Sequence, residues 1–321
     1  MIDISIVIPI FNEEDNVAPL CAKLHDALSK TGRSYEIILV DDGSSDRSWE
    51  RLKEQRIPHL RLIRFRRNFG QTAAMSAGFH ASRGEVIITM DADLQNDPAD
   101  IPQLLEKMKD GVDVVSGWRK DRKDPFINRR LPSMLANALI SRITGVRLHD
   151  HGCTLKAYRR EVMQNVELYG EMHRFIPVFA SWVGGRIEEV AVSHHPRQFG
   201  KSKYGISRTV RVVLDLMTVT FLIRYSTRPI QVFGRFGLLA GSIGLLMLFG
   251  MIVGNASFRL FGTTFAADLI KRPFWIMTSF MMVFFGIQFV SMGLLAEIQI
   301  RTYHESQKKP IYVIRETVDT P

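Results

Sequence analysis

Val86-Ile-Ile-Thr-Met-Asp-Ala-Asp-Leu-Gln95 leads from a β-branched, apolar segment directly into two carboxylates. A continuous apolar run of this length is typical of a parallel strand that is covered on both faces. In sheets of this kind, ligands bind beyond the carboxyl ends of the strands. The segment therefore predicts an α/β fold with a polar site at one edge of its sheet.

The same arrangement recurs along the N-terminal part of the chain. Apolar runs predict strands at Ile4–Ile10, Ile37–Asp41, Leu60–Phe65, Val86–Asp91 and Val112–Ser116. Helical spacing of apolar residues predicts helices over Val17–Leu28, Ser45–Arg56, Gln71–Ala81 and Pro98–Lys109. No G-x-G-x-x-G or G-x-x-x-x-G-K-[ST] segment follows a strand, which counts against dinucleotide oxidoreductases and P-loop hydrolases. We expect a mostly parallel sheet flanked by helices.

Asp91 and Asp93 are the strongest local indication of chemistry. Two neighbouring carboxylates repel each other unless a cation or hydrogen-bond donors offset their charge. Mg²⁺ and Mn²⁺ are held by one or two carboxylates together with substrate phosphates. A solvated turn or a helix cap is the alternative interpretation, because Asp is common at strand ends.

Two uncharged segments, Phe236–Phe258 and Pro273–Ala296, follow the large N-terminal part. Roughly 20 helical residues cross the ~30 Å hydrocarbon core of a bilayer, so both segments are long enough to do so. The alternative is a buried hairpin in a soluble protein, but the rest of the chain is too small to cover two such helices on all sides. We predict two transmembrane helices.

The orientation follows from the N-terminus. Met1–Phe11 lacks the basic start and the long apolar stretch of a secretory signal. We expect a protein of the cytoplasmic (inner) membrane whose catalytic domain and both termini are cytoplasmic, since two crossings return the tail. Basic residues of the tail agree with this orientation, whereas Arg259, Lys271 and Arg272 in the connecting loop weaken the argument from charge.

Charge and cysteine content limit the partners. The formal net charge of +9 indicates an anionic partner, and the membrane segments favour phosphorylated substrates or a membrane surface over nucleic acid. Cys21 and Cys153 have no metal-type spacing, which argues against a disulfide framework or a zinc site. We expect no nucleic-acid partner, and we expect a homo-oligomer.

Two basic amphipathic segments precede the membrane helices. The first lies near residues 129–144 and the second within residues 205–232, each with arginines beside its apolar positions. Either segment is able to pack on the core of the domain. Their position before the membrane helices favours helices that lie in the membrane interface.

Three strand-end motifs resemble the glycosyltransferases of family 2 with a GT-A fold: Pro9-Ile-Phe-Asn-Glu-Glu14, Asp41-Asp-Gly-Ser44 and Asp91-Ala-Asp-Leu-Gln95. In that family, carboxylates near the second strand bind the nucleotide base, and the D-x-D element binds ribose and the metal-diphosphate. The resemblance implies a nucleotide-sugar site made of Pro9, Asn12, Glu13, Asp41, Asp42, Arg67, Gln71, Asp91 and Gln95. It also implies Mg²⁺ or Mn²⁺ bound by Asp91, Asp93 and Gln95.

Four further segments are similar to the dolichol-phosphate mannose synthase branch and its bacterial polyisoprenyl-phosphate relatives: Arg67-Asn-Phe-Gly-Gln-Thr-Ala-Ala-Met75, Asp150-His-Gly-Cys-Thr-Leu-Lys-Ala-Tyr158, Arg174-Phe-Ile-Pro177 and Arg197-Gln-Phe-Gly-Lys-Ser-Lys-Tyr204. The similarity covers residues 3 to about 225, and the two C-terminal helices match the bacterial members. The Gln-x-x-Arg-Trp element of processive polysaccharide synthases is not found. The resemblance implies inverting, metal-dependent transfer from UDP-glucose or a similar UDP-sugar to undecaprenyl or dolichyl phosphate.

An acceptor of this kind is a phosphomonoester, which is largely dianionic at neutral pH. It must be oriented toward the sugar, but it does not need to be deprotonated first. Guanidinium groups match phosphate oxygens, and lysine adds a mobile charge. We therefore place Arg119, Arg197, Lys201 and Ser202 around the acceptor phosphate, and we predict Asp93, Asp150 and Arg119 as the catalytic residues. Asp150 is able to orient a substrate, to act as a weak base, or simply to cap the turn that follows it.

The sequence thus predicts a catalytic domain over residues 1–204, a juxtamembrane segment over 205–232, a transmembrane hairpin over 233–300 and a cytoplasmic tail over 301–321. Two other functions stay open. The first is a GT-A transferase for a different lipid, such as diacylglycerol. The second is a non-catalytic membrane scaffold that binds nucleotide sugars, which has no need to keep both Asp91 and Asp93.

Overall fold

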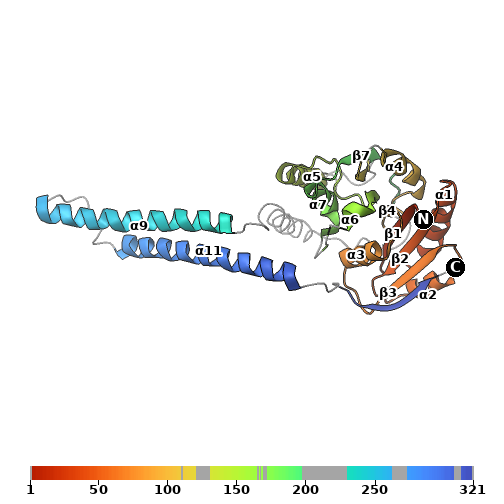
Figure 1. Cartoon of the computed structure of the whole chain (residues 1–321), viewed down its shortest axis with the longest axis horizontal. Helices are drawn as coiled ribbons and strands as arrows, with labels where there is room; N and C mark the ends of the chain where they lie inside the picture. Colours follow the sequence, from red (N-terminus) through yellow and green to blue (C-terminus); the bar gives the residue numbers. More distant parts are fainter. Residues whose placement is uncertain are drawn as a thin grey trace. The chain divides into compact units, whose positions relative to one another are not determined.

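The computed structural model describes residues 2–109, 111–120, 131–164, 166, 168, 172–196, 230–261, 273–306 and 312–319. The chain forms two compact units, one made of Met1–Val219 with Pro310–Pro321 and the other of Thr220–Lys309. The first unit contains the sheet, and the second contains two long helices (Figure 1).

The first unit is built on an eight-stranded sheet with the order β7-β5-β6-β4-β1-β2-β3-β8. The strands are β1 (Ile4–Ile10), β2 (Tyr35–Asp41), β3 (Leu60–Phe65), β4 (Val86–Thr89), β5 (Val114–Trp118), β6 (Lys156–Arg159), β7 (Ile187–Ala191) and β8 (Ile314–Asp319). β6 and β8 are antiparallel to their neighbours, whereas the other strand pairs are parallel. The predicted α/β class with a mostly parallel sheet is confirmed.

Helices cover both faces of this sheet (Figure 1). The described helices of this unit are α1 (Val17–Ser29), α2 (Ser48–Glu54), α3 (Gln71–Ala81), the 3₁₀ helix η1 (Pro98–Asp100), α4 (Ile101–Lys107), α5 (Leu131–Thr144), α6 (Arg160–Met163), the 3₁₀ helix η3 (Met172–Phe175) and α7 (Ile176–Trp182). Burial on both faces explains the apolar run of β1, where the successive residues Ile6 and Val7 are both fully buried. On one face α3 lies very close to the sheet, because a Cβ on Gly78 would lie 2.1 Å from a methyl group of Val7.

Two element boundaries differ from the prediction in ways that bear on function. β4 ends at Thr89, so the main chain leaves the sheet before it reaches Asp91. α2 begins at Ser48 rather than Ser45 because the intervening residues form a turn, in which the Ser48 N–H donates to the Asp46 carboxylate at 3.0 Å. Both differences lengthen the loops at the carboxyl edge of the sheet.

β6, which the sequence did not predict, changes what meets at that edge. It lies between β4 and β5 but runs in the opposite direction, with Lys156 paired with both Thr89 and Ser116. An antiparallel strand starts where its parallel neighbours end. The turn that precedes Lys156 is therefore placed beside the residues that follow β4.

The C-terminal segment also differs from the expected tail. After a helix that ends at Ser306, Ile314–Asp319 forms β8 and pairs with the edge strand β3. The Arg61 guanidinium binds the Asp319 carboxylate through two contacts, 2.7 Å from Nε and 3.4 Å from Nη2. β8 gives the otherwise unpaired edge of β3 a backbone partner.

The second unit is a pair of helices, α9 (Ile230–Phe261) and α11 (Pro273–Ser306). Both are long and apolar enough to cross a membrane, over Phe233–Ala256 and Pro273–Ala296. Only 11% and 17% of their most apolar windows are buried, which is far below what the core helices of a soluble protein require. This exposure favours the membrane interpretation over a buried hairpin.

Glycines bring the two helices of this unit together. A Cβ on Gly237 would lie 2.7 Å from the carbonyl oxygen of Gly286, and a Cβ on Gly286 would lie 2.8 Å from the Cα atom of Gly241. Small residues let helix backbones approach closely in a membrane, where packing and not the hydrophobic effect drives association.

Replacement of Gly286 by leucine is expected to separate α9 from α11, because the new side chain has no space between the backbones. Overpacking of this kind costs about 1–3 kcal/mol or more. The thermal unfolding midpoint in detergent should fall. Gly250→Leu is the matched control, because a Cβ there meets nothing within 4 Å. Equal behaviour of the two variants would contradict the close packing at Gly286.

Candidate active site

Asp42 fixes one loop at the carboxyl edge of the sheet. Its carboxylate accepts hydrogen bonds from the main-chain N–H groups of Phe69 at 2.7 Å and Gly70 at 2.9 Å. Gly43, with φ at +68°, lies against the same loop, since a Cβ there would be 2.4 Å from the carbonyl carbon of Arg67. Burial raises the pKa of Asp42 to about 6, although both N–H groups oppose that rise.

Asn12 and Glu13 connect the ends of β1 and β2. Asn12, at φ +53°, donates its N–H to the Ser44 hydroxyl at 2.9 Å, and its side-chain oxygen accepts from the N–H of Ser45 at 2.9 Å. The N–H of Glu13 donates to the Ser48 hydroxyl at 2.8 Å. The predicted base-binding motifs therefore form one continuous surface, with Pro9 beside Val40 in the strands beneath it.

Asp41 lies below this surface and is fully buried. Burial raises its pKa, and the Arg64 guanidinium, whose Nε lies 3.3 Å from Asp41 Oδ2, acts in the opposite direction. Arg64 also lies over the Trp49 ring, with its guanidinium carbon 5.4 Å from the ring centroid. Asp41 is thus held by Arg64 of β3 and by the N–H of Ser44, which donates to its Oδ1 at 3.2 Å.

Asp91 and Asp93 lie in the loop after β4. The Gln71 amide donates to Asp91 Oδ1 at 2.8 Å, and Asp93 Oδ1 accepts from the N–H of Gln95 at 3.1 Å. Leu94, which lies between Asp93 and Gln95, has φ at +59°. Burial, followed by the negative charge of Asp93, raises the pKa of Asp91 to about 6.

This donor set fits a hard divalent cation that shares its ligands with a substrate. Within the described ranges, no group of three or more His, Cys, Asp or Glu side chains is placed to hold a metal alone. Mg²⁺ and Mn²⁺ are commonly bound by one or two carboxylates, with phosphates and water completing the shell. Asp91 and Asp93 would be the carboxylates that hold the ion. For Gln95 the metal-binding role stays a prediction.

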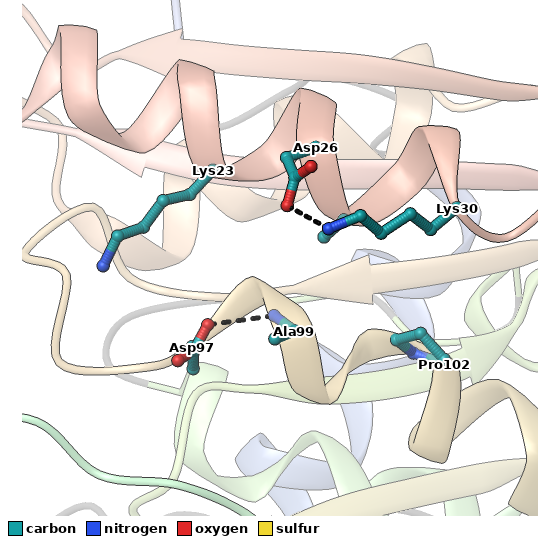
Figure 2. A pocket seen from close by; sticks show the side chains of 7 residues that line it. Lys23, Asp26, Lys30, Asp97, Ala99 and Pro102 are labelled. Atoms are coloured by element: carbon teal, nitrogen blue, oxygen red, sulfur yellow. Dashed lines mark hydrogen bonds and ion pairs between the residues drawn. The ribbon is translucent and has the colours of Figure 1, made fainter.

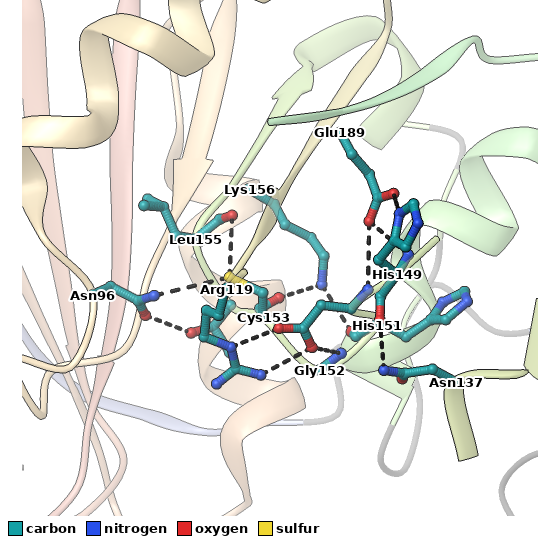
Figure 3. A network of polar contacts seen from close by, with 12 residues as sticks. Asn96, Arg119, Asn137, His149, His151, Gly152, Cys153, Leu155, Lys156 and Glu189 are labelled. Atoms are coloured by element: carbon teal, nitrogen blue, oxygen red, sulfur yellow. Dashed lines mark hydrogen bonds and ion pairs between the residues drawn. The ribbon is translucent and has the colours of Figure 1, made fainter. Parts of the chain in front are cut away.

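Arg119 and Asp150 form an ion pair at the same edge (Figure 3). Nε of Arg119 donates to Asp150 Oδ2 at 2.7 Å and Nη2 donates to Oδ1 at 3.0 Å, with the two side chains 15% and 3% exposed. Burial acts to lower the pKa of Arg119, but the hydrogen bonds and charge of Asp150 outweigh it and raise the pKa. Arg119 also lowers the pKa of Asp91 to a smaller extent, so the predicted acceptor and metal residues share one electrostatic environment.

Lys156 is a site residue to which the sequence assigned no role. Its side chain is buried, and Nζ donates to the carbonyl oxygens of His151, at 3.1 Å, and Cys153 (Figure 3). Burial lowers the pKa of Lys156, and the negative charges of Asp150 and Asp91 only partly oppose that shift. A lysine inside the apolar run Leu155-Lys-Ala-Tyr158 is a sequence signal that could have identified it.

Contacts with neighbouring segments also hold the turn that contains Asp150. The Thr154 hydroxyl donates to the Asn96 side chain at 3.0 Å, which joins the turn to the loop after β4. On the other side, Glu189 of β7 accepts from the N–H of His149 at 2.8 Å, and the His149 ring stacks on Trp118 with centroids 4.3 Å apart. Asp150 therefore lies in a turn that is held from both sides.

Of the remaining predicted site residues, Arg67 lies within the described part of the chain and the acceptor residues do not. Arg67 lies beside the site, with its guanidinium carbon 4.2 Å from the Phe69 ring centroid. The predicted acceptor residues Arg197, Lys201 and Ser202, and most of the predicted segment 205–232, lie outside the described residues.

A separate shallow groove of about 200 Å³ lies between α1 and η1 (Figure 2). It is lined by Lys23, Asp26, Ala27, Lys30, Asp97, Ala99 and Pro102. Several of its charged groups are engaged, since Lys30 pairs with Asp26 at 2.6 Å and Asp97 pairs with His195 at 2.8 Å. No predicted site residue lines this groove, so we assign the chemistry to the carboxyl edge of the sheet.

Comparison with known proteins decides the family. The family described as Glycosyl transferase family 2 matches residues 5–166. The chain belongs to glycosyltransferase family 2. Family 2 relatives include the dodecaprenyl-phosphate galacturonate synthase of Rhizobium johnstonii, 44% identical over 99% of this chain and 94% of that protein. The undecaprenyl-phosphate 4-deoxy-4-formamido-L-arabinose transferase of Edwardsiella ictaluri is 38% identical over 98% of this chain and 94% of its own length.

Solved structures confirm the GT-A-type fold predicted for this family 2 enzyme. Glucosyl-3-phosphoglycerate synthase from Mycobacterium tuberculosis, in complex with Mn²⁺, UDP and glucosyl-3-phosphoglycerate, matches with a TM-score of 0.52 and 17% identity, over 70% of this chain and 82% of that one. Its complex with Mn²⁺ and UDP-glucose matches with a TM-score of 0.51 and 16% identity, over 70% and 81% of the two chains. At this identity the likeness concerns the fold.

Metal binding at Asp91 and Asp93 should depend on pH. Because the pKa of Asp91 is raised to about 6 and a metal binds only the carboxylate, protons compete as the pH falls through 6. The affinity for Mn²⁺ in the presence of UDP, measured by electron paramagnetic resonance, should be constant above pH 7 and fall by up to about tenfold per unit below pH 6.

UDP itself titrates in this range, so the comparison is with Asp91→Asn. This variant should bind Mn²⁺ more weakly and with a shallower dependence on pH. Identical pH profiles for the two proteins would remove Asp91 from the metal site.

Arg119→Ala should destabilise the catalytic unit, because it leaves the buried Asp150 without its main cation. Breaking a buried ion pair costs about 3–5 kcal/mol. Denaturant unfolding followed by the fluorescence of the adjacent Trp118 measures the change. The double variant Arg119→Leu with Asp150→Leu removes both charges and should regain much of the stability but not sugar transfer. Full transfer by the double variant would show that the pair is only structural.

Proposed function

We propose that this family 2 glycosyltransferase moves a sugar from a nucleotide-diphosphate donor to a polyprenyl phosphate in the membrane, with inversion at the anomeric carbon. The observation that carries the proposal is the meeting of two charge systems at one edge of the sheet. These are the Asp91–Asp93 pair, with the pKa of Asp91 raised, and the Arg119–Asp150 ion pair. The names of relatives that match over nearly the full length support the same reaction.

On the donor side, Asp91 and Asp93 would hold a divalent cation, which supplies Lewis-acid stabilisation of the departing diphosphate when bound. Gln71 orients the Asp91 carboxylate through its hydrogen bond of 2.8 Å. Asp42 fixes the loop of residues 67–70 against the end of β2, so the nucleoside has a rigid surface on which to lie. These residues position the sugar carbon before attack.

On the acceptor side, the nucleophile is a phosphate oxygen, which attacks the anomeric carbon from the face opposite the diphosphate. Asp150 engages two of the five N–H groups of Arg119 and so fixes the plane of the guanidinium. We assign the remaining N–H groups of Arg119, together with Arg197, Lys201 and Ser202, to the acceptor phosphate. Asp150 then acts by orienting Arg119 rather than as a base.

For the transferred sugar, the relatives suggest candidates other than the UDP-glucose expected from the sequence. One relative is named for galacturonate and the other for 4-deoxy-4-formamido-L-arabinose. We propose a galacturonosyl nucleotide as the first donor to be tested, because the galacturonate synthase has the higher identity of the two, 44% against 38%.

The membrane arrangement is proposed from chain connectivity. β8 follows α9 and α11 in the sequence but lies in the same sheet as β1. If these helices cross the membrane, the number of crossings between the two parts of the sheet must be even. We propose two crossings with a cytoplasmic catalytic unit, and we propose that α5, with Met134 57% and Leu139 44% exposed, lies in the membrane interface.

The test uses the purified full-length chain in detergent with Mn²⁺ and four labelled donors: UDP-galacturonate, UDP-glucuronate, UDP-glucose and GDP-mannose. Undecaprenyl phosphate and diacylglycerol are offered as acceptors. Label should pass to undecaprenyl phosphate, and the anomeric configuration of the product should be opposite to that of the donor. Asp93→Ala should lower the rate at least a hundredfold, since it removes a contact to the metal-diphosphate worth several kcal/mol.

Transfer to diacylglycerol alone would contradict the proposed acceptor. Nucleotide binding without transfer from any donor would support the scaffold interpretation. Unchanged transfer by Asp93→Ala in chelator-treated buffer would remove the metal from the mechanism.

A further inference from the structure

Three aromatic rings connect the C-terminal segment to a predicted donor-binding residue. Tyr312 is stacked on Phe65, with ring centroids 5.1 Å apart and planes at 12°. Phe65 meets Phe69 edge to face, at 5.7 Å and 90°. The Arg67 guanidinium lies over the Phe69 ring, with its carbon 4.2 Å from the ring centroid. The contacts run without interruption from Tyr312 to Arg67.

The main chain makes a parallel connection. The N–H of Arg66 donates to the carbonyl oxygen of Val313 at 3.1 Å, directly before the loop that contains Arg67. On its other side, this loop is held by Asp42 through the N–H groups of Phe69 and Gly70. Residues 66–70 are therefore fixed between the C-terminal segment and the end of β2.

The buried surface of the C-terminal segment lies mainly at Tyr312, the residue that contacts Phe65. Five of the six residues of β8 are exposed, so the strand adds little to the core of the sheet. Tyr312 lies two residues before the start of β8 and is half-buried. Desolvation raises the pKa of its hydroxyl. Its hydroxyl lies 3.4 Å from Nδ1 of His80, and the Phe65 ring against which it stacks is 1% exposed. Tyr312 is thus the main packed side chain of the segment.

We propose that Tyr312 is a positioning residue for the nucleotide-sugar donor. Through Phe65 and Phe69 it holds loop 66–70 in the conformation in which Arg67 faces the donor diphosphate and Asp42 retains its two amide hydrogen bonds. The inference rests on the proposed function for the identity of the ligand.

The test compares three substitutions in the full-length protein. Tyr312→Ala removes the stack, Tyr312→Phe keeps it, and Glu316→Ala changes an exposed residue of β8. Tyr312→Ala should raise the KM for the nucleotide sugar about three- to tenfold, the range expected for one lost aromatic pair, with the KM for undecaprenyl phosphate and kcat within twofold of the parent. Tyr312→Phe and Glu316→Ala should match the parent.

Hydrogen exchange supplies a readout that does not depend on activity. In Tyr312→Ala, the amides of Phe69 and Gly70 should exchange about three- to tenfold faster, because both donate to Asp42 from the loop that loses its support. Should Tyr312→Ala fail to fold, Tyr312→Leu retains an apolar contact without the ring and should shift both readouts in the same direction.

An unchanged donor KM, or equal changes in both KM values and in kcat, would overturn the positioning role and leave Tyr312 as a structural residue. Failure of the proposed function looks different. In that case the parent transfers no sugar, while the effect of Tyr312 on amide exchange and on UDP binding persists.

Discussion

The placement of several carboxylates at one buried edge of a sheet is the constraint on which the rest of the structure depends. A carboxylate that is taken out of water needs a donor or a cation nearby. The chain supplies one in most cases: Arg64 for Asp41, two main-chain amides for Asp42 and Arg119 for Asp150. Asp91 accepts from Gln71, and Asp93 accepts from the N–H of Gln95. Burial, followed by the negative charge of Asp93, still raises the pKa of Asp91.

The direction of a single short strand brings the two halves of the site together. If β6 ran parallel to β4, its preceding turn would lie at the opposite edge of the sheet, far from Asp91. Because it runs antiparallel, Lys156 pairs with Thr89, and the turn that contains Asp150 lies beside the loop after β4. The buried lysine then holds that turn through two carbonyl groups. One reversal in an otherwise parallel region thus places the turn that contains Asp150 beside the loop that contains Asp91 and Asp93.

Sequence reasoning reached the parts of this arrangement that are local. β1 and β3 have the predicted bounds because their apolar runs are continuous and end at turn residues. Asp91 and Asp93 were proposed as site residues from their position at a strand end together with the family resemblance. β6 and β8 were not predicted, because strands of four and six residues are stabilised by partners far away in the sequence. The same reason hid Lys156 and Tyr312, whose importance depends on which side chains the fold places against them.

The pairing of β3 with β8 also imposes an order on the assembly of the molecule. Arg61 and Asp319 are 258 residues apart, and both long apolar helices are synthesised between them. Chains emerge from the ribosome N-terminus first, so the sheet stays incomplete while these helices are made. During that time β3 is an open edge able to pair with another chain, a hazard limited by its length of six residues and by Arg61 and Arg64. The sheet is completed by β8 only after both helices have been synthesised.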